Sequence, residues 1–134
     1  MKLLIDTNII LEVILEQAKG EEVRALLSKT EEHEFFISDY ALHSIGLLLF
    51  RRKQHQVFRQ FLHDMLFNAG MMVASLPIDY MEPVIEASEK FNLDFDDAYQ
   101  YAVAAKYDYI LVSLDSDFDN TERGRKTPTT VLQG

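Results

Sequence analysis

The sequence predicts an α/β fold in which a mainly parallel sheet of four or five strands is covered by helices on both faces, forming a three-layer sandwich. Short apolar runs typical of buried strands alternate along the chain with longer segments whose apolar residues recur at helical spacing. Strands separated by helices are joined by right-handed crossovers, which produce parallel pairs with a helical layer on each face.

The first half of the chain contains two predicted strands and four predicted helices. The strands run from Lys2 to Asp6 and from Glu34 to Ser38, and both are short and rich in apolar residues. Apolar stripes mark the helices, and Gly70 ends the last of them. The helices are centred on Ile9 to Ile14, on Val23 to Leu27, on a segment from a cap at Ser38 or Asp39 to about Arg52, and on Val57 to Met65.

The second half continues the alternation with two more strands and two more helices. We predict strands from Met71 to Leu76 and from Tyr109 to Ser113. Between them, one helix starts at Pro77 and ends near Asn92, because proline favours a first helical turn and asparagine favours a helix exit. The next helix opens at Asp97, followed by small residues at helical spacing.

The C-terminal segment is predicted to end the sheet. A polar loop from Asn120 to Lys126 leads to Thr129 to Leu132, which we expect to form an edge strand despite Pro128. No internal repeat, low-complexity tract or linker divides the chain, so we expect one domain over residues 1–134.

Composition and charge narrow the possible functions. The 134 residues are 48% hydrophobic, which is enough for the core of one ordinary domain. Cysteine is absent, so any metal must be bound by oxygen or imidazole. No apolar stretch is as long as a membrane span and none resembles a signal peptide, so we expect a soluble, cytoplasmic protein.

The net charge of −9 argues against a surface built for broad nucleic-acid attraction, but not against a nuclease whose acidic site is neutralised by cations.

Three aspartates are placed where a parallel sheet would bring them to one edge. Asp6 closes the first strand, Asp115 follows the fourth, and Asp97 opens a helix whose N-terminus faces the same edge. Each one alone is explained equally well as a helix cap or turn residue. Together they would repel one another unless cations neutralise them, and hard oxygen ligands suit Mg²⁺ or Mn²⁺. The arrangement therefore predicts a metal site.

The ordered motifs resemble the PIN-domain nucleases. The matching segments are Asp6-Thr7-Asn8 after the first strand, Asp97-Ala98 at the start of a helix rich in small residues, and Ser113-Leu114-Asp115-Ser116-Asp117-Phe118 after a late strand. The likeness spans essentially the whole chain in order and spacing. Within that family, the chain resembles the small single-domain proteins typified by VapC toxins of toxin–antitoxin pairs.

The resemblance implies a Mg²⁺- or Mn²⁺-dependent endoribonuclease that hydrolyses RNA phosphodiester bonds without a covalent intermediate. By matching position, Asp6, Asp97 and Asp115 would be the catalytic metal ligands, with Asp117 as an additional or outer ligand. The groups implied to orient these carboxylates are Thr7, Asn8 and Ser113. The protein would be the toxin of a type II pair.

One position departs from the family pattern. The family usually has a glutamate in the helix after the second strand, and this position falls at Ser44. Asp39, at the end of the second strand, is a candidate substitute, although it is equally well explained as a helix cap. Glu12 and His43 are weaker candidates. The departure motivates an alternative function, a degenerate PIN domain that binds RNA or protein without cleavage.

Basic and apolar residues indicate partners. The loop after Asp117 contains three candidates for RNA contact, Arg123, Arg125 and Lys126. The basic cluster from Arg51 to Lys53 is better explained as solvent-exposed residues at the C-terminus of a helix. The segment from Leu47 to Phe50, together with Phe58, Phe61 and Phe67, is more apolar than one helix face needs, which either core packing of a helical hairpin or an interface explains. In the small PIN toxins, which the chain resembles, such a helical region joins a homodimer and receives the antitoxin.

Two other enzyme classes also use aspartates at strand ends. A phosphatase of the haloacid dehalogenase type needs a second aspartate two residues after its nucleophile, where this chain has Asn8. A phospho-receiver domain needs an acidic pair near the N-terminus, which is missing. Both fit the sequence poorly.

Overall fold

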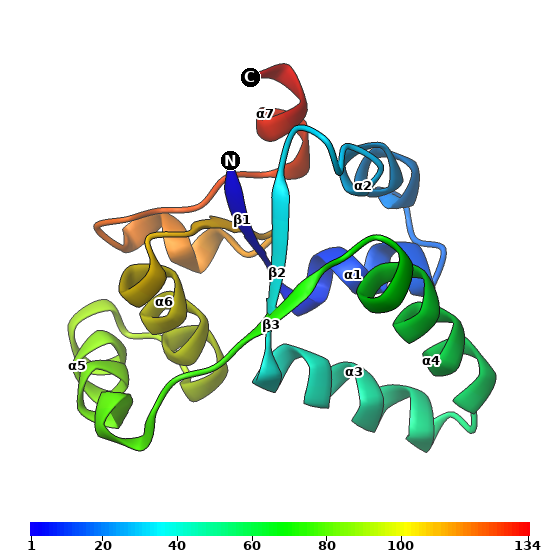
Figure 1. The fold of residues 1–134 in the computed structure, drawn as a ribbon. Coiled ribbons are helices and arrows are strands. Elements are labelled where there is room, and N and C mark those ends of the chain that lie inside the picture. The colour runs from blue at the N-terminus through cyan, green and yellow to red at the C-terminus, as the bar shows by residue number, and fades with distance from the viewer.

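Four short strands form a single parallel sheet in the computed structural model, which describes residues 1–134 (Figure 1). The strand order is β3-β2-β1-β4, and every neighbouring pair is parallel. The bounds are Lys2–Ile5 for β1, Glu34–Ser38 for β2, Met72–Ala74 for β3 and Ile110–Val112 for β4. The predicted α/β class is confirmed, and all four predicted strands are present, the third shorter than expected.

Alternation along the central strands explains why both faces of the sheet are covered. In β1, Leu3 and Ile5 belong to one hydrophobic core and Leu4 belongs to the other, and all three side chains are fully buried. In β2, Phe35 and Phe36 divide in the same way. Successive strand residues point to opposite faces, so a strand that is apolar throughout needs a helical layer on each side.

The first layer of helices covers one face of the sheet. Its members are α1 (Thr7–Ile14), α2 (Gly20–Leu27), α3 (Asp39–Arg51), α4 (His55–Phe61) with the π-helical turn η1 (Leu62–Asn68), and the C-terminal α7 (Pro128–Gln133). Buried side chains such as Ile9, Leu26 and Ile45 pack from this layer against the sheet. Figure 1 shows α1, α2 and α4 on the side of the sheet opposite to α5 and α6.

The second layer covers the other face. It consists of the short 3-10 helix η2 (Ile78–Tyr80), α5 (Met81–Phe91), α6 (Phe95–Tyr107) and the 3-10 turn η3 (Ser116–Asn120). Tyr99 and Val103 of α6 and Phe118 of η3 are fully or almost fully buried against Leu4 and Phe36. The two helical layers and the sheet between them form the predicted three-layer sandwich.

Two sequence predictions need correction. The segment Thr129–Leu132 is not an edge strand but part of α7, because Pro128 occupies the first helical turn and the Thr127 hydroxyl accepts the Thr130 N–H as an N-cap. The additional pairing with β4 lies just upstream, where Lys126 forms an isolated parallel bridge with Val112. The helix that carries Asp97 also starts earlier than predicted.

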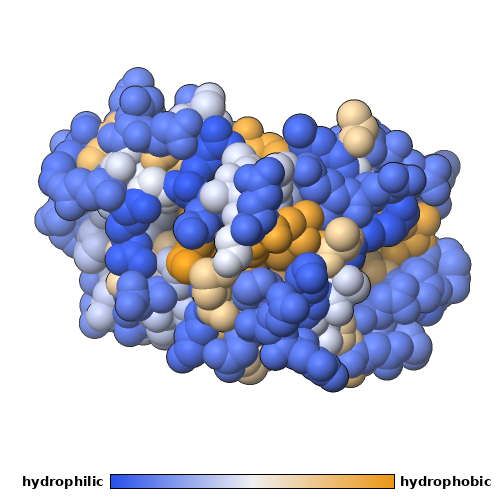
Figure 2. Space-filling model, turned by 90° about the horizontal axis from the view of Figure 1, so that it is seen from above, coloured by the Kyte–Doolittle hydropathy of each residue, from blue (hydrophilic) through white to orange (hydrophobic).

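No helix of the chain is both long and apolar enough to cross a membrane. Figure 2 shows the end of the molecule that is at the top of Figure 1, where β1 and β2 begin. This end is largely hydrophilic, with an apolar strip across its middle. The aspartates singled out by the sequence lie at the opposite end, where β1 and β4 finish.

Candidate metal centre

A cavity of about 310 Å³ lies beyond the carboxyl ends of the strands and brings together the three aspartates predicted to meet. Asp6 follows β1, Asp97 lies in the first turn of α6, and Asp115 follows β4. The other lining residues are Thr7, Asn8, Leu11, Tyr40, Ala41, Ser44, Asp94, Asp96 and Gln100. Open parallel sheets bind ligands at this edge.

Asp6 is held rigidly at the bottom of the cavity. It caps α1, its Oδ1 accepts the Thr7 N–H at 2.8 Å and the Gln100 Nε2–H at 3.0 Å, and its Oδ2 accepts the Ser113 hydroxyl at 2.7 Å. The residue is only 6% exposed. Burial raises the pKa of the Asp6 carboxyl, although the three hydrogen bonds act in the opposite direction.

Ser113 and Asn8 connect the ends of β1 and β4. The Ser113 hydroxyl oxygen accepts the Asp115 N–H at 2.9 Å and the Asn8 Nδ2–H at 3.3 Å. The Asn8 Oδ1 in turn accepts the Leu114 N–H at 3.2 Å. The positions of Asp6 and Asp115 are therefore coupled through hydrogen bonds that Ser113 makes to both residues. Thr7 contributes its backbone N–H.

Asp97, Asp115 and Asp117 form a cluster of carboxylates beside Asp6. One oxygen from each of the three lies within 4.8 Å of the others, close enough to hold a metal ion together. Asp97 and Asp115 are half-buried and Asp117 is exposed. Asp115 caps η3 by accepting the Asp117 N–H at 2.9 Å, so the turn that follows β4 brings both carboxylates to the same edge.

The charge of this cluster is visible in the pKa of Asp97. Burial and then the charges of Asp94, Asp115 and Asp6 raise the pKa of Asp97 to about 7. A divalent cation would relieve this repulsion, and a set of carboxylate oxygens without sulfur or imidazole fits a hard cation such as Mg²⁺ or Mn²⁺. The donor set therefore fits the metal that the sequence predicts.

Comparison with known proteins now decides the family. The PIN domain family model matches residues 3–124. The chain belongs to the PIN domain family. The phosphatase and phospho-receiver alternatives are thereby set aside, and we found no significant match among curated protein sequences.

Solved structures of toxin–antitoxin proteins share this PIN fold. VapBC2 from Rickettsia felis, bound to a DNA fragment from its promoter, matches with a TM-score of 0.75 at 14% identity, over 95% of this chain and 97% of that one. VapC20 from Mycobacterium tuberculosis, a toxin that cleaves the sarcin–ricin loop, matches with a TM-score of 0.73 at 20% identity, over 90% and 95%. A toxin–antitoxin complex from Klebsiella pneumoniae gives 0.70 at 20% identity, over 94% and 97%.

The position at which a PIN domain usually carries a glutamate does face the cavity. Ser44, on α3, lines it, so the acid that is missing from the sequence is missing from this wall. Asp39 lines a neighbouring cavity instead, and its Oδ1 accepts the Tyr99 hydroxyl at 2.9 Å and the Tyr40 N–H at 3.0 Å. Glu12 lies outside the lining, with Oε2 buried and without a hydrogen-bond partner.

The basic residues of the loop after Asp117 mainly brace this PIN domain. Arg123 donates to Asp108 at 2.9 Å and to the Tyr109 carbonyl at 3.1 Å. Arg125 binds Asp119 through two nitrogens and donates to the Ser113 carbonyl at 3.0 Å, with its side chain 15% exposed. Lys126 pairs with β4 through its backbone. None of the three lines the acidic cavity.

Sequence reasoning missed two residues that matter for the site. Gln100 is 4% exposed, and it lies one helical turn after Asp97, so its spacing was a signal that the site extends along α6. Its Nε2 holds Asp6, whereas its Oε1 is buried without a hydrogen-bond partner. The second is Asp94, which none of the sequence motifs singles out. It is the N-cap of α6, accepting the Asp97 N–H at 2.9 Å, and it also lines the cavity.

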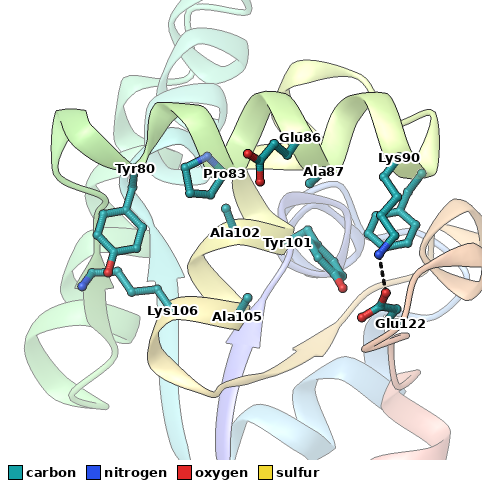
Figure 3. Close-up of a pocket in the computed structure, with 11 residues that line it drawn as sticks. Tyr80, Pro83, Glu86, Ala87, Lys90, Tyr101, Ala102, Ala105, Lys106 and Glu122 are labelled. Carbon is teal, nitrogen blue, oxygen red and sulfur yellow. Dashed lines mark hydrogen bonds and ion pairs between the residues drawn. The ribbon is translucent and has the colours of Figure 1, made fainter.

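A second cavity, of about 400 Å³, lies between α5 and α6 away from the aspartates (Figure 3). Lys106 lies over the Tyr80 ring at 4.3 Å at one end, and Lys90 pairs with Glu122 at the other. Its cations are matched by an aromatic ring and a carboxylate, and it contains no cluster of acids. The carboxylates suited to binding a cation therefore lie in the acidic cavity and not in this one.

Proposed function

We propose that this chain is a Mg²⁺- or Mn²⁺-dependent endoribonuclease that hydrolyses RNA phosphodiester bonds. The observation that carries the proposal is the acidic cavity, in which Asp6, Asp97 and Asp115 converge from three distant segments with Asp117 beside them. Membership of the PIN domain family supports the same activity. A fold that needed only packing would not favour these adjacent carboxylates, because burial and the charges of Asp94, Asp115 and Asp6 raise the pKa of Asp97.

In this proposal Asp97, Asp115 and Asp117 bind the cation, and Asp6 completes the negative wall behind it. A bound divalent cation polarises the scissile phosphate and lowers the pKa of a water molecule. The hydrogen bonds from Gln100 and Ser113 keep the Asp6 carboxylate oriented, and the Ser113–Asp115 contact keeps the two strand ends in register. Such a preorganised charge distribution needs little rearrangement during the reaction.

The test is cleavage of RNA by the purified protein with Mn²⁺ or Mg²⁺. We expect cleavage that stops with a chelator and that is lost in Asp97→Asn and in Asp6→Asn. Asp79→Asn serves as the matched control, because it removes the same charge at an exposed position outside the cavity. Cleavage that persists in both site variants would contradict the assignment of these residues.

We further propose that the protein is the toxin of a type II toxin–antitoxin pair, works as a homodimer and binds an antitoxin protein. The structural likeness to toxin–antitoxin proteins supports this. An apolar groove of about 440 Å³ between α3 and α4, lined by Leu47, Phe50 and Phe58, provides a surface suited to a partner chain. Sedimentation of the wild type and of Phe50→Asp would test whether copies associate there.

A second candidate function is a PIN domain that binds RNA or protein without cutting it. Ser44 favours this reading, because it leaves the cavity wall one carboxylate short. Titration calorimetry with Mn²⁺ separates the two functions. Absence of binding at millimolar Mn²⁺ in a folded protein would favour the non-catalytic function.

A further inference from the structure

Three aromatic rings form a layered group at the rim of the acidic cavity. Tyr99, on α6, is 1% exposed, and the Tyr40 ring lies parallel to it at a centroid distance of 3.8 Å and an angle of 2°. Phe95 is tilted against Tyr40 at 5.5 Å and is 51% exposed. The buried ring therefore supports a second, half-buried ring, and an exposed phenylalanine lies at its edge.

Tyr40 separates two adjoining cavities. It lines the acidic cavity, and it also lines a neighbouring cavity of about 520 Å³ together with Asp39, His43, Ser44 and Asp96. Tyr40, Ser44 and Asp96 are common to both linings, so the two cavities adjoin at these residues. A ligand whose phosphate lies among the aspartates can therefore place its next group beside the Tyr40 ring.

The chemistry of the cavity of about 520 Å³ identifies that group. Its lining contains two carboxylates and no lysine or arginine, so it repels phosphate. A nucleobase is uncharged, has a flat face for stacking, and carries N–H groups that carboxylates can accept. Unpaired bases of RNA are commonly held by stacking on aromatic side chains.

We propose that Tyr40, with Phe95 at its edge, stacks one unpaired nucleobase of the RNA, adjacent to the phosphate bound in the acidic cavity. Tyr99 supports the platform from behind, and the Asp39 carboxylate fixes Tyr99 by accepting a hydrogen bond from its hydroxyl, with 2.9 Å between the oxygens. This inference rests on the proposed ribonuclease function. It makes the substrate single-stranded or looped at the cleaved position, because a base within a duplex cannot reach the ring.

The experiment uses single-stranded RNA oligonucleotides in which 2-aminopurine, a fluorescent base that is quenched by stacking, is moved one position at a time. Binding is measured with Ca²⁺ in place of Mn²⁺ to separate it from cleavage. We expect one position at which the wild type changes the fluorescence, and loss of that change in Tyr40→Leu and in Phe95→Leu. RNA affinity should fall about fivefold or more in Tyr40→Leu, as for loss of one base–aromatic stack.

Phe67→Leu is the matched control, because Phe67 is 75% exposed on η1 and lies outside both cavities. An RNA that is abasic at the responsive position completes the design: it should bind the wild type more weakly and should bind Tyr40→Leu and Phe95→Leu no more weakly than intact RNA does. Equal affinity and fluorescence in wild type, Tyr40→Leu and Phe95→Leu would overturn the inference. Failure of the ribonuclease proposal is distinct, because the wild type would then stack the base and still not cleave with Mn²⁺.

Discussion

Asp97 is the residue whose ionisation conflicts most with the folded structure. Its pKa, about 7, lies well above the ordinary value of 3.8, because of burial and the charges of Asp94, Asp115 and Asp6. Between these two values the folded protein binds more protons than the unfolded chain does, so the free energy of unfolding falls as the pH rises through this interval. The raised pKa of Asp6 acts in the same direction.

We therefore predict that the metal-free protein has a higher Tm at about pH 5 than at about pH 7.5. Asp97→Asn should make the Tm depend less on pH and should raise the Tm at the higher pH. It should also abolish Mn²⁺ binding, so the substitution gains stability and loses function. Thermal unfolding with a chelator, followed by circular dichroism, measures both effects. Asp79→Asn should keep the wild-type dependence, and an Asp97→Asn protein less stable than wild type at the higher pH would contradict the repulsion.

Adding an acid at Ser44 should strengthen Mn²⁺ binding, whereas removing the acid at Asp97 should abolish it. Ser44→Glu places a carboxylate on the wall of the cavity where PIN domains usually have one, and the cavity of about 310 Å³ has room for the longer side chain. Affinity for Mn²⁺ should rise by about tenfold or more, because affinity for hard cations grows with the number of charged ligands.

Calorimetry of Mn²⁺ binding compares Ser44→Glu with wild type and with Gln56→Glu, which adds the same charge on the exposed surface of α4. If both glutamates raise the affinity equally, the effect is one of overall charge and not of a site. If neither does, residue 44 does not take part in the metal centre.

Single residues also show where sequence reasoning stops. Asp6, Asp97 and Asp115 could be predicted to converge because strand ends and helix starts meet at one edge of a parallel sheet. The spacing of Gln100, one helical turn after Asp97, places it on the same side of the helix, but a glutamine within a helix carries no sign of whether it is buried, so its hydrogen bond to Asp6 could not be predicted.

At the scale of elements, the start of α6 combines structure and function. Asp94 caps the helix by accepting the Asp97 N–H. Burial is the largest cause of the raised pKa of Asp97, and the charge of Asp94 is the next largest. The sequence favoured Asp97 as the first helical residue because the small-residue pattern begins there. The cap lies three residues earlier, since a run of acidic residues offers several equivalent capping oxygens.

Two substitutions at Asp94 separate these roles. Asp94→Ser keeps a capping oxygen and removes the charge, so we expect a weaker fall in stability between about pH 5 and about pH 7.5 than in wild type. Asp94→Ala removes both, and its free energy of unfolding should lie about 1 kcal/mol below that of Asp94→Ser at either pH. Urea unfolding measures the difference. Equal stability of the two variants would show that the cap contributes nothing.

The C-terminal segment shows that a local signal can favour the wrong element. Threonine, valine and leucine favour a strand at Thr129–Leu132, and Pro128 opposes that strand. In the structure, Pro128 is a favourable first-turn residue of α7, and Thr127 provides the cap. The contacts of α7 with α2, including Val131 in the core, decide between the two.

At the scale of the whole molecule, the alternation of strands and helices was enough to predict the sheet, its parallel pairing and its two covered faces. The sequence contained nothing that determined the division of the helices, with α5 and α6 on one face and the rest on the other (Figure 1). The face of the sheet that each crossover covers determines this division. The same division leaves the aromatic rings of Tyr40, Tyr99 and Phe95 at the rim of the acidic cavity.

The net charge of the molecule leads to a last prediction, about salt. The charge is −9, no lysine or arginine lines the acidic cavity, and Lys90, Arg123 and Arg125 are engaged in ion pairs, so we expect few contacts between basic side chains and RNA phosphates near the cavity. Each phosphate neutralised on a single strand contributes about −0.7 to the slope of log K against log salt concentration. We expect a slope shallower than about −1.5, together with strong dependence on the divalent cation.

Fluorescence anisotropy of labelled single-stranded RNA, with Ca²⁺ held constant and KCl varied, measures this slope. The combined variant Arg51→Gln, Arg52→Gln, Lys53→Gln tests the exposed basic cluster at the end of α3 and should leave the slope unchanged. A steep slope that this variant reduces would place RNA binding on the basic cluster. Affinity would then come from the basic surface and not from the cation and the stacked base.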